Sequence, residues 1–319
     1  MIMKQEEKVL TRDVVMKLGL DKVDVITSDM IEGYTSIGYY AFFDCFSLSS
    51  VSIPDSVTSI GNYAFEGCSS LKSVTIGNSV IKIGSGSFWN CSSINSIVLP
   101  NSVTSIGFHA FNGCSALTSI NIPNSVTSIG EGVFYGCSSL ASITIGSSVS
   151  IIGAMAFKDC SSLNSISLPN SVISIGYGAF ENCFVLTSVS LGNSVTSICW
   201  NAFYGCNKLK NVVIGDKTYE KQKVVNCKCK AYKAFNVDLT CRGFQYEEGK
   251  TYEIEDEPKL CEHGFHACLM LTDVFKYYCG ELGKDMVVHE VEMENVSEER
   301  NKEDSKVVAR KITIGKRIL

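Results

Sequence analysis

The chain has 319 residues, 15 cysteines and a formal net charge of −5, and its length suits two domains. The acidic balance argues against nucleic acid or an anionic membrane surface as a partner. Charge is distributed unevenly, because 11 charged side chains lie between residues 34 and 211 and 38 lie between 216 and 319. The composition therefore indicates a weakly charged region followed by a highly charged one.

The N-terminal segment, residues 1–33, is predicted to cap the region that follows. Thr11 can cap a short helix that ends at Gly19. The residues expected on one side of this helix are Val14, Val15 and Leu18. Residues 25–37 then have the pattern of a degenerate half repeat, which is typical of the end of a repeat array.

Residues 1–8 lack the apolar core of a secretion signal. No later run approaches the ~20 apolar residues of a membrane-spanning helix. We therefore expect a cytoplasmic protein without a membrane span.

Residues 34–215 repeat with a 23-residue period, without insertion or deletion. Each of eight copies carries a phenylalanine at the third position before a cysteine. A fixed period of this length predicts a solenoid. The phenylalanines are Phe42, Phe65, Phe88, Phe111, Phe134, Phe157, Phe180 and Phe203, and the cysteines are Cys45, Cys68, Cys91, Cys114, Cys137, Cys160, Cys183 and Cys206.

Each copy can be interpreted as one rung of the solenoid. In the second copy, Val51 and Ile53 alternate with serines, which predicts a short strand. Pro54 then makes a corner, a second segment ends at Gly61, and a tight helical or 3₁₀ turn completes the rung. The side chains expected to point inward are Leu48, Val51, Ile53, Val57, Ile60, Ala64, Phe65 and Cys68.

The cysteine of each rung is expected to be a small interior side chain, stacked on those of neighbouring rungs. A thiol ladder that binds soft metal or forms disulfides is the alternative, and burial in a cytoplasmic protein argues against it. Cys199 stands where other copies carry glycine, and we interpret it as drift of the repeat.

The whole unit, L-x-x-V/I-x-I-P-x-S-V-x-x-I-G-x-x-A-F-x-x-C, resembles the BspA-type leucine-rich repeat over about residues 34–215. The resemblance implies an architecture and no particular ligand. It departs from ordinary leucine-rich repeats at the asparagine after the strand, where Ser56, Ser79 and Ser102 stand. It also implies exposure at the cell surface or secretion for many members, so the missing signal favours an intracellular or phage-type setting here.

The solenoid surface is rich in Ser, Thr, Asn and Tyr, and carries five lysines against six acidic residues. We therefore favour a non-catalytic interaction or scaffold protein that binds a protein or other macromolecule through this surface. A single outward row is expected to carry the binding site, and we assign Thr58, Lys82, Thr104 and Thr127 to it. The alternative is that the solenoid is only a spacer.

After a charged connector, residues 216–230, the pattern changes to a small α+β domain over 231–319. The fold class is therefore α+β overall, with a β-rich leucine-rich-repeat solenoid followed by this domain. Strands are predicted at 231–235, 287–293 and 306–314, and Thr272 is expected to cap a helix. In the solenoid itself, residues 211–214 are expected to form the last strand.

The densest cluster of chemically active side chains in this domain suggests zinc. Its members are Cys261, His263, His266 and Cys268, with Cys227, Cys229 or Cys241 as possible further ligands. The spacing is poor for a structural zinc site, because on a strand these side chains would face opposite sides. We therefore expect no metal, and a zinc-stabilised module stays an alternative.

Residues 232–236, 241–246 and 264–268, with the closing strand predicted over 307–314, resemble a small uncharacterised C-terminal domain of phage and bacterial proteins. More distantly, residues 264–267, 273–278 and 287–293 are similar in order to the central motif of ADP-ribosyltransferases. That resemblance would place Arg242 and His266 in a nicotinamide-dinucleotide pocket. The tyrosine expected after the glycine and a matching catalytic glutamate are missing, so we favour a shared fold without activity and assign no catalytic residue and no cofactor. An ADP-ribosyltransferase-like enzyme domain, carried by a solenoid that is only a spacer, stays the alternative.

Overall fold

In the computed structural model, the described residues are 8–199, 201–221, 229–236, 240–241, 244–253, 265–268, 286–296 and 306–317. The chain divides into two units, the first with Met1–Thr196 and Asn201–Val224 and the second with Val225–Leu319. The strand Ser197–Ile198 is described with the first unit because it belongs to the same sheet as Ser174–Ile175. Each unit is described by itself below.

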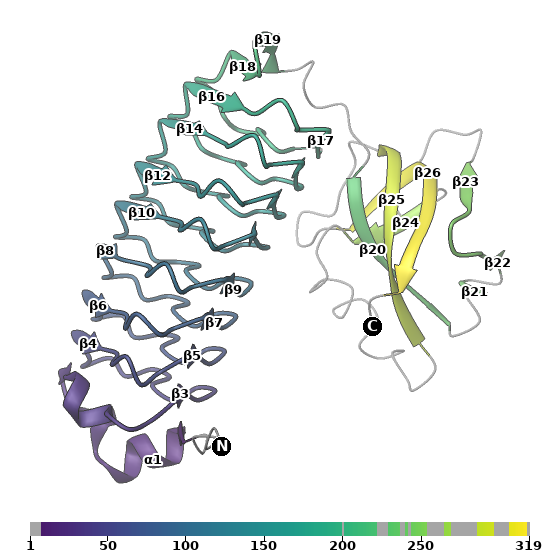
Figure 1. The fold of residues 1–319 in the computed structure, drawn as a ribbon. Coiled ribbons are helices and arrows are strands. Elements are labelled where there is room, and N and C mark those ends of the chain that lie inside the picture. Colours follow the sequence, from purple (N-terminus) through teal and green to yellow (C-terminus); the bar gives the residue numbers. More distant parts are fainter. Residues whose placement is uncertain are drawn as a thin grey trace, which may run out of the picture. The chain divides into compact units, whose positions relative to one another are not determined.

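The first unit is the solenoid that the fixed period predicts, and each repeat makes one turn (Figure 1). Its first side is a row of parallel strands in which Ser50 pairs with Ser73 and Ser73 with Ser96, in register with the repeat. These strands are β2 (Val25–Ile26), β4 (Ser50–Ser52), β6 (Ser73–Thr75), β8 (Ser96–Ile97), β10 (Ser119–Asn121), β12 (Ser142–Thr144), β14 (Ser165–Ser167), β16 (Ser188–Leu191) and β18 (Asn211–Ile214).

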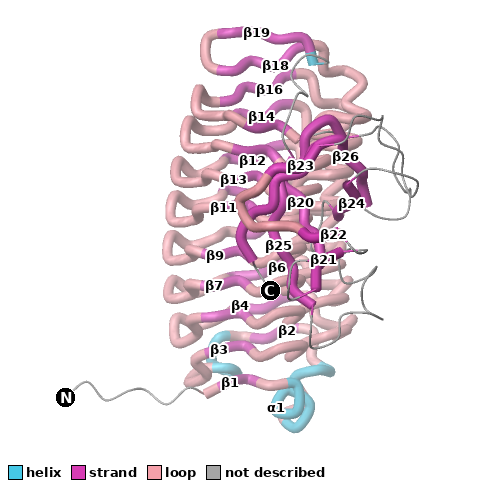
Figure 2. Tube along the Cα trace, turned by 90° about the vertical axis from the view of Figure 1, so that its right-hand side faces the viewer, coloured by secondary structure: helices cyan, strands magenta, loops and turns pink. Residues whose placement is uncertain are grey.

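A second row of short parallel strands follows the Pro or Gly corner of each rung, and the two rows stack along the solenoid (Figure 2). Here Ile37 pairs with Ile60 and Ile60 with Ile83. The strands are β1 (Val9–Leu10), β3 (Ser36–Ile37), β5 (Ser59–Ile60), β7 (Lys82–Ile83), β9 (Ser105–Ile106), β11 (Ser128–Ile129), β13 (Ile151–Ile152), β15 (Ser174–Ile175) and β17 (Ser197–Ile198).

The interior contains the side chains that the sequence predicts. All eight inward residues of the second copy, from Leu48 to Cys68, are buried. The phenylalanines stack rung upon rung, with ring centroids 5.0–5.6 Å apart. One rung cannot enclose such rings alone, so the stability of each rung depends on its neighbours.

The ladder cysteines are buried and free, as expected, and the structure gives a further reason for them. From Cys68 onward, each thiol donates to the carbonyl oxygen of the phenylalanine of the preceding rung, at 3.0–3.3 Å. Burial raises the pKa of Cys91, Cys114 and Cys160 well above the usual thiol value. These three thiols are therefore neutral hydrogen-bond donors near pH 7.

The N-terminal segment forms a rung of its own, because β1 and β2 pair with β3 and β4. Helix α1 (Arg12–Lys17) begins at Thr11, whose side chain accepts from the Val14 amide, and the left-handed Gly19 follows its end. Two 3₁₀ turns follow, η1 (Leu20–Lys22) and η2 (Ser28–Ile31). The half repeat over 25–37 is confirmed by β2 and β3.

The prediction that Val14, Val15 and Leu18 lie on one side of the helix, facing the first rung, was partly wrong. Val15 is buried, whereas Leu18 is 53% exposed. Helix α1 is less than two turns long, and Leu20 in η1 enters the core in place of Leu18.

The third side of each rung, which contains the phenylalanine and cysteine, was expected to be helical or 3₁₀ and is not. It is a series of tight turns, for example from Tyr63 O to Glu66 N (3.2 Å) and from Phe65 O to Cys68 N (3.2 Å). The residues before Ala-Phe and before Cys both have left-handed backbones, such as Tyr63 (φ 56°) and Gly67 (φ 75°). A left-handed residue interrupts a helix and is typical of type II turns. We call this side the turn face.

The sequence predicts that residues 211–214 form the last strand of the solenoid, but one more strand follows them. Strand β19 (Lys217–Glu220) folds back and pairs antiparallel with β18. Lys221 Nζ then donates to the carbonyl oxygen of Cys206 at 3.0 Å. All four β19 residues are exposed, so this hairpin places a charged, polar strand at the sheet edge, which disfavours pairing with other chains.

The described strands of the second unit include those predicted at 231–235, 287–293 and 306–314, and others that the sequence did not predict. The described strands are β20 (Cys229–Asn236), β21 (Thr240–Cys241), β22 (Phe244–Gln245), β23 (Thr251–Glu253), β24 (Phe265–Cys268), β25 (Met286–Val296) and β26 (Lys306–Arg317). Strand β20 pairs with β24 and β25, and β26 pairs with both of these, so the four strands are joined in a ring. The helix expected at Thr272 lies outside the described residues.

Candidate functional site

The four residues assigned to one binding row do not lie in one row. Backbone hydrogen bonds connect Thr58 with Ile81 and Ile81 with Thr104. Lys82 pairs instead with Ser59 and Ser105 in the neighbouring row. The sequence assignment was wrong here, because the repeat position of Thr58 is occupied in the next rung by Ile81, and Lys82 is the residue after it.

The hydroxyl groups of this region stabilise the stacking of rungs. Thr58 Oγ1 donates to Thr35 O at 3.1 Å, and Thr104 Oγ1 donates to Ile81 O at 3.4 Å. Ser102, which stands where ordinary leucine-rich repeats carry asparagine, donates to Val80 O at 2.7 Å. The Ser/Thr-rich composition thus has a structural explanation, since these hydroxyls bond to the carbonyls of the previous rung.

Only some of the candidate site residues of the second unit lie among the described residues. Arg242, Cys261 and His263 lie outside the described residues. His266 and Cys268 lie in β24, opposite Val308 and Lys306 of β26. Within the part of the chain that the structure describes, no group of three potential ligands gathers around a metal position. The zinc and dinucleotide hypotheses stay predictions.

The turn face carries a continuous group of aromatic side chains that the sequence analysis did not single out. Tyr40 stacks on Tyr63 (centroids 5.1 Å apart, planes at 22°), and Tyr63 is followed by Trp89 at 6.3 Å. Trp89 in turn stacks on His109 at 5.6 Å. Tyr39, 58% exposed, lies edge-on to Tyr40 at 4.1 Å. We call Tyr39, Tyr40, Tyr63, Trp89 and His109 the aromatic stripe.

The rings of the stripe reach from one rung to the next in two ways. Tyr40 and Tyr63 occupy the same left-handed position in successive rungs and stack directly. Gly86 follows Tyr63 in this row, and a Cβ at Gly86 would lie 2.5 Å from the Tyr63 ring. The missing side chain leaves room for Tyr63 to extend toward Trp89.

Hydrogen bonding and burial fix the protonation state at the N-terminal end of the stripe. A hydrogen bond with Tyr39, together with burial, raises the pKa of Tyr40 to about 12. Burial also raises the pKa of Tyr63. Both phenols are neutral near pH 7, so the stripe presents hydrogen-bonding groups and no phenolate charge.

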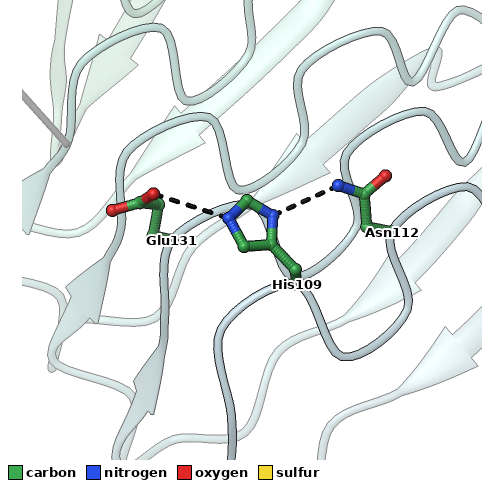
Figure 3. Close-up of polar contacts among 3 residues, drawn as sticks. All are labelled: His109, Asn112 and Glu131. Atoms are coloured by element: carbon green, nitrogen blue, oxygen red, sulfur yellow. Dashed lines mark hydrogen bonds and ion pairs between the residues drawn. The ribbon is translucent and has the colours of Figure 1, made fainter. Parts of the chain in front are cut away.

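His109 joins the stripe to a buried carboxylate (Figure 3). Its Nε2 lies 3.5 Å from Glu131 Oε1, and Asn112 Nδ2 lies 3.1 Å from its Nδ1. When Nδ1 accepts from the amide, the Nε2 proton points at Glu131, which is only 7% exposed. The imidazole is thus held rigidly between two rungs.

Beyond His109 the turn face becomes charged. Lys158 Nζ lies 3.2 Å from Glu181 Oε1 and 5.7 Å from the centroid of the Tyr135 ring. Asn182 Nδ2 donates to Asp159 Oδ1 at 2.8 Å. Aromatic rings, carboxylates and amides on one face can bind a polypeptide surface by stacking and hydrogen bonding.

The comparisons with known proteins follow the same division of the chain. Residues 35–163 and 133–245 match the BspA type leucine rich repeat region, in six copies. The chain belongs to the BspA-type leucine-rich repeat family. Its residues 229–319 match a domain of unknown function, DUF7666. No curated protein matches the chain.

Solved structures similar to this BspA-type chain are bacterial leucine-rich repeat proteins. The Treponema pallidum leucine rich repeat protein is 32% identical, with 59% of this chain and 78% of that one covered and a TM-score of 0.44. A leucine-rich repeat protein from Bacteroides ovatus is 28% identical, with a TM-score of 0.38. The match covers 57% of this chain and 59% of the length of the Bacteroides protein.

The pneumococcal vaccine antigen PcpA is 20% identical, with 61% of this chain and 60% of that one covered and a TM-score of 0.33. The repeat fold of the BspA-type family is consistent with an interaction or scaffold role. Among the described residues of this chain, no helix has the length and apolar character needed to cross a membrane.

Proposed function

We propose that this chain is a non-catalytic interaction protein whose solenoid binds a protein partner through the aromatic stripe. The stripe itself carries the proposal, because its rings are grouped on one face and are not part of the phenylalanine core. Tyr and Trp are the residues most enriched in the energetically important parts of protein interfaces.

The Ser/Thr rows are weaker candidates for the same role. Their hydroxyls donate to carbonyls of the preceding rung, as Thr58 and Thr104 do, and so are already engaged. If the solenoid were only a spacer, the aromatic stripe would have no binding function. Its rings are nevertheless partly exposed at Tyr39, Tyr63 and Trp89, where a partner can contact them. Binding through the stripe therefore accounts for more of the observations.

The test is enrichment of partners from a native lysate with three forms of the full chain. The stripe variant is Tyr39→Asn/Tyr63→Asn/Trp89→Asn, in which each asparagine already occupies the same repeat position in another rung (Asn62, Asn201 and Asn112). The row variant is Thr58→Ile/Lys82→Ser/Thr104→Ile/Thr127→Ile, with residues again taken from equivalent positions (Ile81 and Ser59).

We expect wild type and row variant to retain one common partner and the stripe variant to lose it. Loss of that partner from the row variant alone would place the site on the Ser/Thr surface. Equal retention by all three forms would contradict binding through either surface and favour the spacer alternative.

A further inference from the structure

The N-terminal end of the aromatic stripe carries two carboxylates on adjacent rungs. Asp44 is exposed, and its amide donates to the carbonyl oxygen of Glu66 at 2.8 Å. Glu66 is half-buried, and its Oε2 has no hydrogen-bond partner within the described chain. A buried carboxylate oxygen without a donor is costly, so this end of the stripe lacks a cationic or hydrogen-bonding group.

Within the described residues of the first unit, no side chain supplies that group. The turn segments 38–45, 61–68 and 84–91 contain no lysine or arginine. Arg12 of the preceding rung donates instead to Ala41 O and Cys45 Sγ, each at 3.4 Å. Tyr40 and Tyr63 lie in the electrostatic field of Glu66, which contributes to their raised pKa values.

Further along the same face, the protein shows how such a site holds a cation. Tyr135, Lys158 and Glu181 occupy one repeat position in three successive rungs. Lys158 lies between the other two, 3.2 Å from the Glu181 carboxylate and 5.7 Å from the Tyr135 ring centroid. An ammonium group is thus bound by one aromatic ring and one carboxylate.

The same repeat position at the N-terminal end reads Phe43, Glu66 and Trp89. The carboxylate stands between two aromatic rungs, and no lysine follows it. As around Lys158, a carboxylate and aromatic rings lie close together on this face, but here the rungs next to the carboxylate carry Phe43 and Trp89 instead of a lysine.

We propose that the aromatic stripe and the carboxylates of Asp44 and Glu66 bind a lysine- or arginine-containing segment of a protein partner. The cationic side chain pairs with Glu66 as Lys158 pairs with Glu181, approaching from the solvent side instead of from the preceding rung, while the rest of the segment lies along the rings. This inference rests on the proposed function and names the chemistry of the partner that the stripe selects.

The test uses the full chain and a fluorescein-labelled peptide of four Gly-Lys units, with binding followed by anisotropy at low salt. The same peptide with every lysine acetylated keeps its length and loses its charge. The site variant is Asp44→Asn/Glu66→Gln, and asparagine already occupies the position of Asp44 in two other rungs, at Asn90 and Asn182.

The matched control is Asp55→Asn, which removes one charge from another side of the solenoid. Asp55 Oδ1 accepts from the Asn78 amide at 2.6 Å, and Asn124 makes the equivalent bond to Ser147 at 2.8 Å. Asparagine can therefore replace Asp55 without loss of this hydrogen bond.

We expect the Gly-Lys peptide to bind wild type and Asp55→Asn within about twofold of each other, and the site variant about five- to tenfold more weakly. Acetylation should weaken binding to wild type by at least the same factor. Equal binding to the site variant and wild type, or equal binding of the acetylated peptide, would overturn the proposal.

Two further outcomes separate this inference from the proposed function. If the stripe variant loses its enriched partner but the Gly-Lys peptide does not compete for that partner, the stripe binds a protein and the cationic segment is wrong. The second outcome is that the peptide fails to bind wild type and Asp44→Asn/Glu66→Gln abolishes self-association of the chain. The stripe would then bind a second copy of the chain, which also overturns this inference.

Discussion

Two adjacent rows of the solenoid behave in opposite ways. In the row from Phe42 to Phe203 every rung carries the same residue, and all eight rings are buried and stacked. In the row one residue later, from Phe43 to Tyr204, the rungs carry Phe, Glu, Trp, Asn, Tyr, Lys, Glu and Tyr. Inward positions fixed by stacking therefore repeat, whereas the neighbouring outward positions of the turn face vary, and the candidate site lies among the varying ones.

The largest expected effect concerns the repeated cysteine row at alkaline pH. Burial raises the folded-state pKa of Cys91, Cys114 and Cys160 above the unfolded value, so their contribution to stability is complete below about pH 8.5. As pH rises further, the unfolded chain loses these protons and the folded chain does not. The free energy of unfolding should then fall by up to about 1.4 kcal/mol per pH unit for each thiol.

Denaturant midpoints measured between pH 7 and 9.5 check this prediction. The control is Cys114→Ala, which should show a shallower decline because one titrating thiol is gone. A midpoint that stays constant across this range would mean that the thiols are not buried as a stacked row.

A smaller loss is expected when one thiol of the row is removed. Cys137→Ala deletes the bond from Sγ to Phe111 O (3.2 Å) and leaves a small cavity, while Phe111 O still accepts from the Cys114 amide. We expect a loss of about 1–2 kcal/mol in the free energy of unfolding. Cys137→Ser keeps a hydrogen-bond donor, so it separates the contribution of the hydrogen bond from that of packing. An unchanged denaturant midpoint for Cys137→Ala would contradict a stabilising role for the cysteine row.

The smallest effect is expected on the Ser/Thr surface. Thr104→Val removes the hydroxyl that donates to Ile81 O at 3.4 Å and keeps the shape of the side chain. We expect a loss of about 0.5 kcal/mol by denaturant unfolding. Thr75→Val, on the exposed side of β6, is the control and should change the midpoint less. A larger loss for the control would show that these hydroxyls do not stabilise rung stacking.

The interior could be predicted from the sequence because stacking demands the same residue at the same position. The fixed period was sufficient to identify the inward side chains, the corners and the two rows of strands. Three strands of the second unit, β20, β25 and β26, were also predictable, for example from the alternating residues of 287–293.

The turn face could not be predicted as well, because its backbone depends on left-handed residues that are not all glycine. A signal was present in the row before each cysteine, where Gly67, Asn90, Gly113 and Asp159 alternate, since these are the residues that tolerate φ above zero. The stripe was missed for another reason. Trp89 and His109 belong to different repeat positions, and their rings meet only because they extend diagonally between rungs.

The most direct test compares the free energy of unfolding of Phe111→Ala with that of Trp89→Asn. Phe111 belongs to the repeated interior, and its loss should cost about 3–5 kcal/mol. Trp89 belongs to the turn face, and asparagine already stands at its position in the next rung, so its loss should cost at most about 1.5 kcal/mol. An equal cost for both variants would make the aromatic stripe part of the structural core and would contradict its assignment as a binding surface.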